Sequence, residues 1–97
     1  MKTFEECQND QVYCVIKEST IQSINDYVDK GYEPGGFVTA VLANDLMGAL
    51  GRADLENRMT IHAICTYVYN EIGSDLHGSY EAVKQHIADI HERISSD

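Results

Sequence analysis

The sequence predicts a compact, all-α domain of about four helices, and three observations support this. Apolar residues recur at helical spacing in four stretches of the chain. Capping residues, glycines and a single proline mark the ends of these stretches. Hydrophobic residues make up 43% of the 97 residues, which is enough to form a core. We assign residues 19–97 to a single helical domain and residues 1–18 to an N-terminal extension.

The first helix is predicted over residues 20–30. Ser19 and Gln22 have the spacing of a capping box, in which Ser19 is the N-cap and Gln22 occupies the third helical position. Gly31 follows where a glycine commonly ends a helix. The apolar stripe of this helix consists of Ile21, Ile24 and Val28.

The second helix is predicted over residues 37–50, after a turn that contains Pro34 and two glycines. This stretch is apolar on nearly all sides, and such a helix usually lies at the centre of a fold. Gly48 in its interior lowers helix stability by roughly 1 kcal/mol relative to alanine. We therefore expect one continuous central helix that other helices surround.

The third helix is predicted from Asp54, a suitable N-cap, to residue 72. It carries two apolar faces. One face consists of Ile61, Ile64, Cys65, Val68 and Ile72, and the other of Leu55, Met59, His62 and Tyr69. The helix therefore packs on two neighbours, or packs on one and offers its second face to a partner.

The last helix is predicted over residues 80–94, after a loop at residues 73–78. Ser79 is its expected N-cap. Its stripe is the most regular in the chain and consists of Tyr80, Val83, Ile87, Ile90 and Ile94.

The N-terminal extension allows two interpretations. Residues 11–16 are rich in β-branched and aromatic side chains, which favours a short strand. A lone strand needs a partner edge, such as that of another subunit. The competing interpretation is a further short helix.

The net charge is −9, from 16 acidic and 7 basic residues. This balance weighs against a protein that binds the nucleic-acid backbone directly and against binding to an anionic membrane. No apolar run approaches the ~20 residues of a membrane span, and no secretory signal is visible. The three cysteines lack metal-type spacing, so we expect reduced thiols and a cytoplasmic location.

No candidate catalytic or metal site emerges from the residue pattern. His86 and His91 are five residues apart, so on a regular helix they point about 140° from each other and cannot share a metal. We expect the histidines to be solvated or hydrogen-bonded structural residues. Cys65 lies on an apolar stripe and is expected to be a small core residue. The sequence therefore predicts no enzyme, no cofactor and no metal.

Acidic residues are the most distinctive candidates for partner binding. Residues 18–56 hold seven acids against two bases, and a dense acidic face can imitate nucleic-acid phosphates and attract a basic groove. The alternative is that these acids only keep the protein soluble. Asp45 and Asp54, with Arg52 and Asn57, also have the alternative role of capping helices around a turn. The candidate partner-binding residues are Asp26, Asp29, Glu33, Asp45, Asp54 and Glu56.

The central half of the chain carries PGGFVTAVL at residues 34–42, NDL at 44–46, RAD at 52–54 with Asn57, and YVYNE at 67–71. In these motifs and their spacing it resembles short acidic proteins of bacteriophages, prophages and other mobile elements. Members of this group often have proline after the Asn-Glu-x element, where this chain has Gly73. The group has no established catalytic activity, so the resemblance implies no catalytic residues.

The resemblance implies a binding role. Small acidic phage proteins often block a host machine, as anti-CRISPR proteins do when they occupy a nucleic-acid channel. By this analogy of class, the expected partner is a host protein with a basic surface, such as a CRISPR surveillance complex. The alternative is a homo-oligomeric structural or accessory phage protein, in which Leu55, Met59 and Tyr69 carry association. A homodimer would form through the spare face of the third helix or through residues 12–16.

Overall fold

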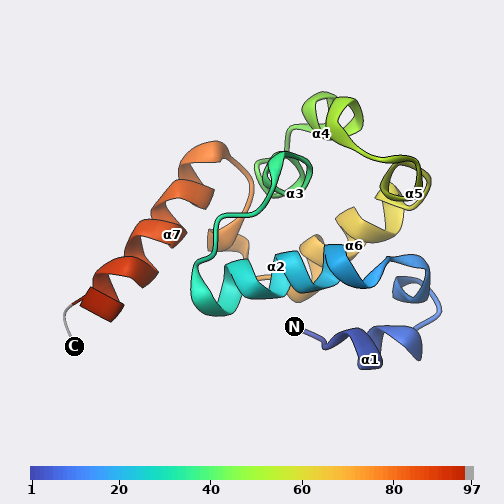
Figure 1. The fold of residues 1–97 in the computed structure, drawn as a ribbon, viewed down its shortest axis with the longest axis horizontal. Coiled ribbons are helices and arrows are strands. Elements are labelled where there is room, and N and C mark those ends of the chain that lie inside the picture. The colour runs from blue at the N-terminus through green and yellow to red at the C-terminus, as the bar shows by residue number, and fades with distance from the viewer. Residues whose placement is uncertain (96–97) are drawn as a thin grey trace.

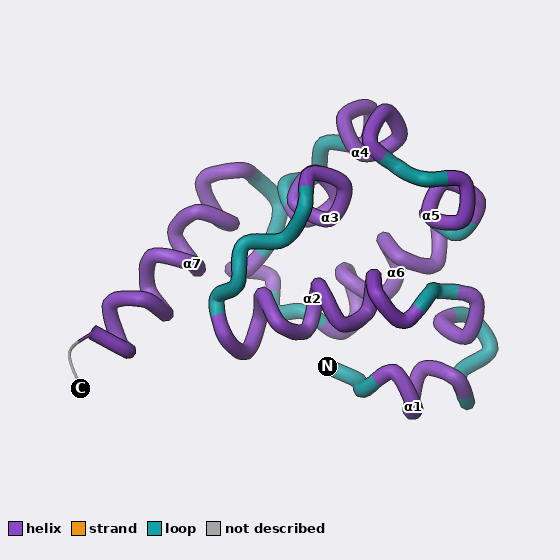
Figure 2. Tube along the Cα trace, viewed as in Figure 1, coloured by secondary structure: helices purple, strands orange, loops and turns teal. Residues whose placement is uncertain are grey.

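The computed structural model describes residues 1–95, and in this part of the chain helices are joined by loops and turns, without strands (Figures 1 and 2). The all-α prediction is therefore confirmed. The helices are α1 (Phe4–Gln8), α2 (Glu18–Lys30), α3 (Gly36–Leu42), α4 (Leu46–Arg52), α5 (Leu55–Met59), α6 (Ile61–Glu71) and α7 (Tyr80–Ser95). Two short 3-10 turns, Tyr13–Val15 and Ser74–Leu76, complete the described chain. About four helices were predicted, and the described residues form seven.

The predicted helix over residues 37–50 is wrong, because the chain breaks into α3 and α4. The break lies at Asn44, whose φ of +62° is left-handed and therefore incompatible with a continuing helix. Asp45 then begins α4 by accepting a hydrogen bond from the Gly48 N–H at 2.9 Å. The two short helices pack against each other instead of forming one rod.

The predicted helix over residues 54–72 is divided as well, into α5 and α6 at Thr60. Thr60 has φ −113° and ψ 13°, and its hydroxyl donates to the Glu56 carbonyl at 2.9 Å. Such bonds from a threonine to the preceding turn bend helices. The predicted N-cap is confirmed, because the Asp54 carboxylate accepts from the Asn57 N–H at 2.8 Å.

Helix α2 ends as predicted but begins earlier. Gly31 is its C-cap, with φ +66°, a conformation that favours glycine. The helix begins at Glu18 with Lys17 as N-cap, so the capping box of Ser19 and Gln22 is wrong. The Lys17 carbonyl accepts hydrogen bonds from the backbone N–H groups of Thr20 and Ile21, which places Ser19 inside the first turn.

The N-terminal segment is a short helix followed by a 3-10 turn, so the alternative of a strand at residues 11–16 is wrong. The Asp10 carboxylate accepts from the N–H groups of Val12 and Tyr13 at 2.8 and 3.0 Å, which curls the backbone. Cys7, Tyr13 and Ile16 are buried in the main core. Residues 1–18, separated above as an extension, thus contribute to the same core as the other helices.

The core lies between α2, α3 and α6. Its largest fully buried side chains include Tyr27, Tyr67, Ile24, Leu42 and Ile64. The two tyrosines place their hydroxyls on polar groups: Tyr27 donates to the Leu76 carbonyl at 2.7 Å, and Tyr67 contacts Lys2 and Asn25. Buried polar groups that find partners in this way fix the packing of distant segments.

Helix α7 packs against α2 and α3, and its C-terminal half projects from the body of the molecule (Figure 1). His86 is buried, and its Nε2 lies 3.0 and 3.1 Å from the carbonyl oxygens of Tyr27 and Val28. The expectation of a structural histidine is confirmed there. Close to the same contact, Gly31 lies against Ile90. The end of α2 therefore depends on α7 for its position.

Candidate functional site

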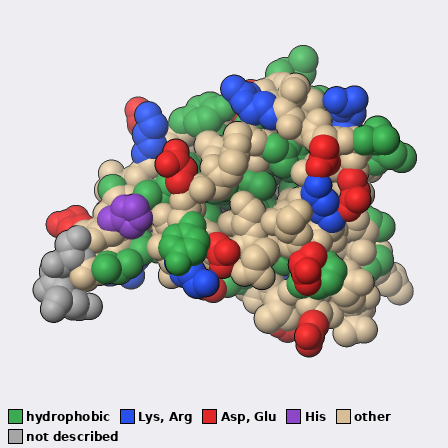
Figure 3. Space-filling model, in the orientation of Figure 1, with side chains coloured by type: hydrophobic (Ala, Val, Ile, Leu, Met, Phe, Trp, Pro, Cys, Tyr) green, Lys and Arg blue, Asp and Glu red, His purple; other side chains and the backbone are tan. Residues whose placement is uncertain are grey.

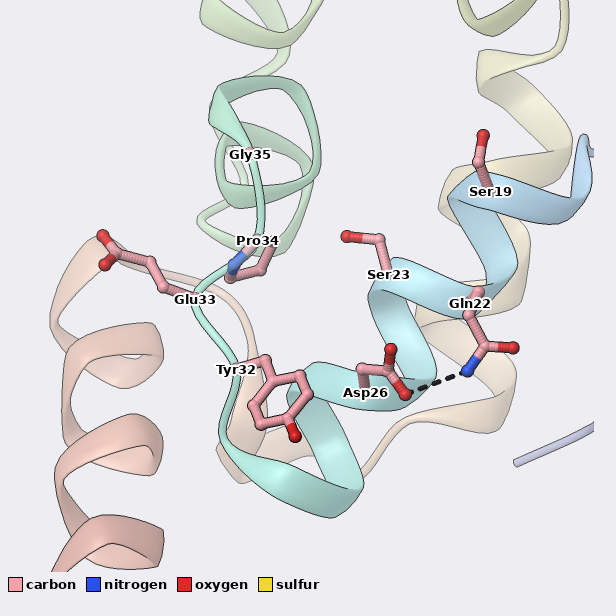
Figure 4. Close-up of a pocket in the computed structure, with 8 residues that line it drawn as sticks. All are labelled: Ser19, Gln22, Ser23, Asp26, Tyr32, Glu33, Pro34 and Gly35. Atoms are coloured by element: carbon pink, nitrogen blue, oxygen red, sulfur yellow. Dashed lines mark hydrogen bonds between the residues drawn. The ribbon is translucent and has the colours of Figure 1, made fainter.

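A polar hollow of about 370 Å³ lies between α2 and the segment that connects it to α3 (Figure 4). Ligand pockets usually have volumes of about 300–1,000 Å³, so this one has room for a side chain or a small molecule. The hollow, called here the α2 hollow, is lined by Ser19, Gln22, Ser23, Asp26, Tyr32, Glu33, Pro34 and Gly35. It brings together two of the six predicted partner-binding residues, Asp26 and Glu33.

The local sequence explains why the connecting segment faces α2. The left-handed conformation of Gly31 ends the helix and turns the chain back along it. At the other end, the Thr39 hydroxyl donates to the Pro34 carbonyl at 3.2 Å, which ties the segment to α3. Gly35 is the N-cap of α3 and has extended geometry. Tyr32 and Glu33 are thus held between two fixed points.

Asp26 is the acid of the α2 hollow whose carboxylate is held in place by neighbouring side chains. Its side chain is 26% exposed, and its Oδ1 accepts a hydrogen bond from Gln22 Nε2 at 2.9 Å (Figure 4). The Lys30 ammonium lies 3.5 Å from the same oxygen and 5.4 Å from the centroid of the Tyr32 ring. Tyr32 lies beside Asp26, whereas the Glu33 carboxylate points away from α2 (Figure 4). The carboxylate that faces the hollow is therefore that of Asp26.

A second hollow continues along α2 and shares Ser19, Ser23 and Gly35 with the first. It takes in a third predicted acid, Asp54, together with the basic residues Lys17 and Arg52. The two hollows form one groove, which we call the α2 groove. The end formed by the α2 hollow is lined by acidic residues, and the end formed by the second hollow is lined by both acidic and basic residues.

Asp54 already has structural partners in this groove. It forms an ion pair with Lys17 and caps α5 through the Asn57 N–H. The Lys17 ammonium and, to a smaller degree, the Asn57 N–H hold the pKa of Asp54 below its ordinary value. Near this cap, the Thr20 hydroxyl donates to the Asn57 side-chain oxygen at 2.7 Å, which joins α2 to α5 inside the protein.

The other three predicted acids lie outside the α2 groove. Asp45 caps α4 and accepts a hydrogen bond from the Tyr80 hydroxyl at 2.6 Å, which lowers the pKa of Asp45 together with the Gly48 N–H. Asp29 and Glu56 are exposed. On the face shown in Figure 3, basic side chains lie between the acidic ones. The α2 groove is thus lined by Asp26, Asp54 and Glu33, of which Glu33 directs its carboxylate away from α2, and the other three acids lie elsewhere.

A second groove, more apolar, lies between α3, α4 and α6, and the sequence did not predict it. It consists of two adjoining hollows that share Val41, Asn44 and Cys65. The hollows extend to Tyr69 and His77 on one side and to Leu46 on the other. The backbone turn at Asn44 separates α3 from α4 and opens this space, so treating residues 37–50 as one helix conceals it.

The prediction that Cys65 is a core residue is wrong, because its side chain is exposed in the apolar groove. Tyr67 turns into the core instead and binds Lys2 and Asn25 through its hydroxyl. The groove walls partly withdraw Cys65 from water, and this desolvation raises the pKa of its thiol. The thiol is therefore protonated at neutral pH, a form that is a poor nucleophile.

The described part of the chain holds no group of three or more His, Cys, Asp or Glu side chains placed to bind a metal ion. Among the described helices, none combines the length and the apolar character needed to cross a membrane. Comparisons with protein-family models, curated proteins and solved structures found no match for this chain. The geometry of the two grooves is thus the basis for inferring function.

Proposed function

We propose that this chain is a small phage- or prophage-encoded binding protein that uses its acidic α2 groove to engage a basic segment of a host protein. Such binding would block a host machine that handles nucleic acid, and a CRISPR surveillance complex is one candidate. The chain would act by binding alone, without catalysis. The resemblance of residues 34–71 to mobile-element proteins motivates the setting of this proposal.

One observation supports the α2 groove as the contact surface. Two acids that the sequence singled out, Asp26 and Asp54, come from separate elements and line the two ends of the groove, and Glu33 lines it with its carboxylate directed away from α2. The protein around them carries a net charge of −9, which attracts basic partners over about one Debye length, ~8–10 Å. An open groove that follows α2 past two adjoining hollows suits an extended basic segment better than a compact small molecule.

The test is affinity capture from a bacterial lysate with a groove variant, Asp26→Asn, Glu33→Gln and Asp54→Ser. Serine at position 54 retains an N-cap for α5, so the variant removes three charges without removing the cap. The matched control removes three charges elsewhere, through Glu5→Gln, Asp89→Asn and Glu92→Gln, all at exposed positions. Proteins that bind through the groove are captured by the wild type and the control but not by the groove variant.

Salt provides an independent measurement on each captured protein. Capture at about 50 mM salt should be lost at about 500 mM, because charge attraction between exposed groups is screened. The proposal is wrong if the groove variant and the control capture the same proteins equally well. It is also wrong if capture is indifferent to salt.

A second candidate function is a homo-oligomeric structural or accessory protein, and the exposure of three apolar residues favours it. Leu55, Met59 and Tyr69 are 69%, 78% and 80% exposed, so the core leaves them available for association. Replacing all three with alanine should dissociate the oligomer in light scattering and leave the helical signal intact. A monomeric mass for the wild type at micromolar concentration would contradict this candidate.

A further inference from the structure

The Lys30 ammonium lies between the two groups of the α2 hollow that attract a cation. It is 3.5 Å from Asp26 Oδ1 and 5.4 Å from the centroid of the Tyr32 ring. A cation within about 6 Å of an aromatic face is attracted by the electrons of the ring. Lys30 does not itself line the hollow, but the protein thus places one of its own cations against two residues that do, which identifies the kind of group that these residues attract.

Lys30 leaves most of the hydrogen-bonding capacity of the hollow unused. Its 3.5 Å separation from Asp26 is long for a charged hydrogen bond, and its own side chain is 55% exposed. Within residues 1–95, no donor contacts Asp26 Oδ2 or the Gln22 side-chain oxygen, and the hydroxyls of Ser19 and Ser23 make no hydrogen bond. Of these groups, Asp26 and Ser23 lie on the side of α2 that faces the connecting segment, so the hollow offers a carboxylate and a hydroxyl near one aromatic ring (Figure 4).

A guanidinium group matches this set of acceptors better than an ammonium does. Arginine carries five N–H donors in a planar fork, binds carboxylates through two parallel bonds and stacks on aromatic rings. Lysine offers three donors from a point charge and does not stack in this way. Ion pairs between exposed partners, such as that of Lys30 with Asp26, contribute little to stability, so Lys30 is displaced easily.

We propose that the α2 hollow is a receptor for one arginine side chain of the partner, and that Lys30 is an internal competitor at its edge, which the arginine displaces from Asp26. The arginine stacks on Tyr32 and binds the Asp26 carboxylate through two parallel N–H bonds, while the Ser23 hydroxyl, which points toward the connecting segment, accepts a further donor (Figure 4). Removing the Lys30 charge opens the receptor. This inference rests on the proposed function and names the residue of the partner that the groove recognises.

The experiment titrates the full-length, 15N-labelled protein with three short peptides of sequence Ac-GSXSG-NH2, followed by amide chemical shifts. The central residue X is arginine, lysine or citrulline, the last being a neutral analogue of arginine with nearly the same shape. The arginine peptide should shift the amides of α2 and residues 32–35, the lysine peptide should bind several-fold more weakly, and the citrulline peptide should not bind.

Two variants of equal charge test the role of Lys30. Lys30→Met should tighten binding of the arginine peptide by about two- to five-fold, which is the range for loss of an exposed competing ion pair. Lys84→Met, at an exposed position on α7, makes the same change in net charge and should leave affinity within experimental error of the wild type. Equal tightening by both variants would overturn the role of Lys30, because the effect would then come from net charge alone.

Two further pairs test the receptor itself. Asp26→Asn should abolish binding of the arginine peptide, whereas Asp89→Asn should not, although Asp89 accepts a similar bond from Gln85 on α7 at 2.8 Å. Tyr32→Leu should weaken binding and Tyr69→Leu should not, both being exposed tyrosines.

The results separate this inference from the proposed function. If no peptide binds, or if the arginine and lysine peptides bind equally, the arginine receptor is wrong. The affinity capture with the groove variant then still decides whether the α2 groove binds a basic partner by charge. If the arginine peptide binds as expected but capture is indifferent to the groove variant, the receptor stands and the proposed function is wrong.

Discussion

Replacing Gly31 with alanine is expected to destabilise the protein strongly, for two reasons that the structure separates. The residue has φ +66°, and left-handed geometry costs a residue with a side chain about 1–2 kcal/mol. A Cβ at this position would also lie 2.9 Å from both Cβ and Cγ2 of Ile90 on α7. Forcing extra atoms into a packed contact costs about 1–3 kcal/mol. Together the two effects predict a loss of about 2–5 kcal/mol, a large share of typical domain stability.

Urea denaturation followed by far-ultraviolet circular dichroism measures this loss, and two other glycines serve as controls. Gly78→Ala adds a side chain at φ +113° with no atom within 4 Å, so it should show the cost of backbone geometry alone. Gly51→Ala lies inside α4 in open space and should stabilise the protein by about 0.5–1 kcal/mol. The reasoning is refuted if Gly31→Ala costs no more than the ~1–2 kcal/mol of its left-handed backbone, because the contact with Ile90 would then be unimportant.

Ionisation should limit stability at both extremes of pH. The pKa values of Asp45 and Asp54 are lowered in the folded state, so their stabilising effect is present above the ordinary value of 3.8 and is lost as the pH falls through the folded values. Tyr80→Phe should raise the pKa of Asp45 in a carbon-detected NMR titration and leave that of Asp54 unchanged; an unmoved Asp45 midpoint would contradict the hydrogen bond. Burial raises the pKa of Tyr27 and Tyr67 to about 12, so helical content should fall between pH 10 and 12, where the unfolded state ionises first. Helical content that is retained at pH 12 would argue against the burial of both phenols.

Signals that act over a few residues were read correctly from the sequence. The stop of α2 at Gly31 and the cap of α5 by Asp54 depend on one residue and its immediate neighbours. The alternative that Asp45 caps a helix is confirmed for the same reason, since it needs only the N–H three residues ahead. Local chemistry is sufficient in these cases, because each depends on one side chain or one backbone conformation next to the helix end.

The errors arose where tertiary contacts compete with a local pattern. Residues 37–50 are apolar on almost every side, so periodicity gave no indication that the helix breaks at Asn44. The capping box at Ser19 has the right spacing, but α2 begins two residues earlier, next to Ile16, whose burial fixes the chain there. At residues 11–16, β-branched side chains favour a strand, yet the Asp10 carboxylate satisfies two backbone N–H groups and produces a turn.

The sequence indicated which acidic residues line the candidate site, but it did not indicate how their side chains are arranged. Charge density pointed to Asp26 and Glu33, and the turn after Gly31 does bring both to one hollow. Sequence spacing gave no indication that the Glu33 carboxylate points away or that the Lys30 ammonium lies beside Asp26. Those features depend on side-chain rotamers and on the packing of α7 against the end of α2. Neither can be predicted from the distribution of charges along the sequence.

The acids of this protein therefore have two separable effects on any basic partner. The field that draws the partner in depends on net charge, and acids committed to helix caps, such as Asp45 and Asp54, contribute to it as fully as the others. Recognition at contact depends on acids that still have acceptor capacity, of which Asp26 is the one that faces a hollow. Changes in distant acids should therefore alter the association rate, and a change in Asp26 should alter the dissociation rate. The number of acids and their positions thus determine different properties of the same complex.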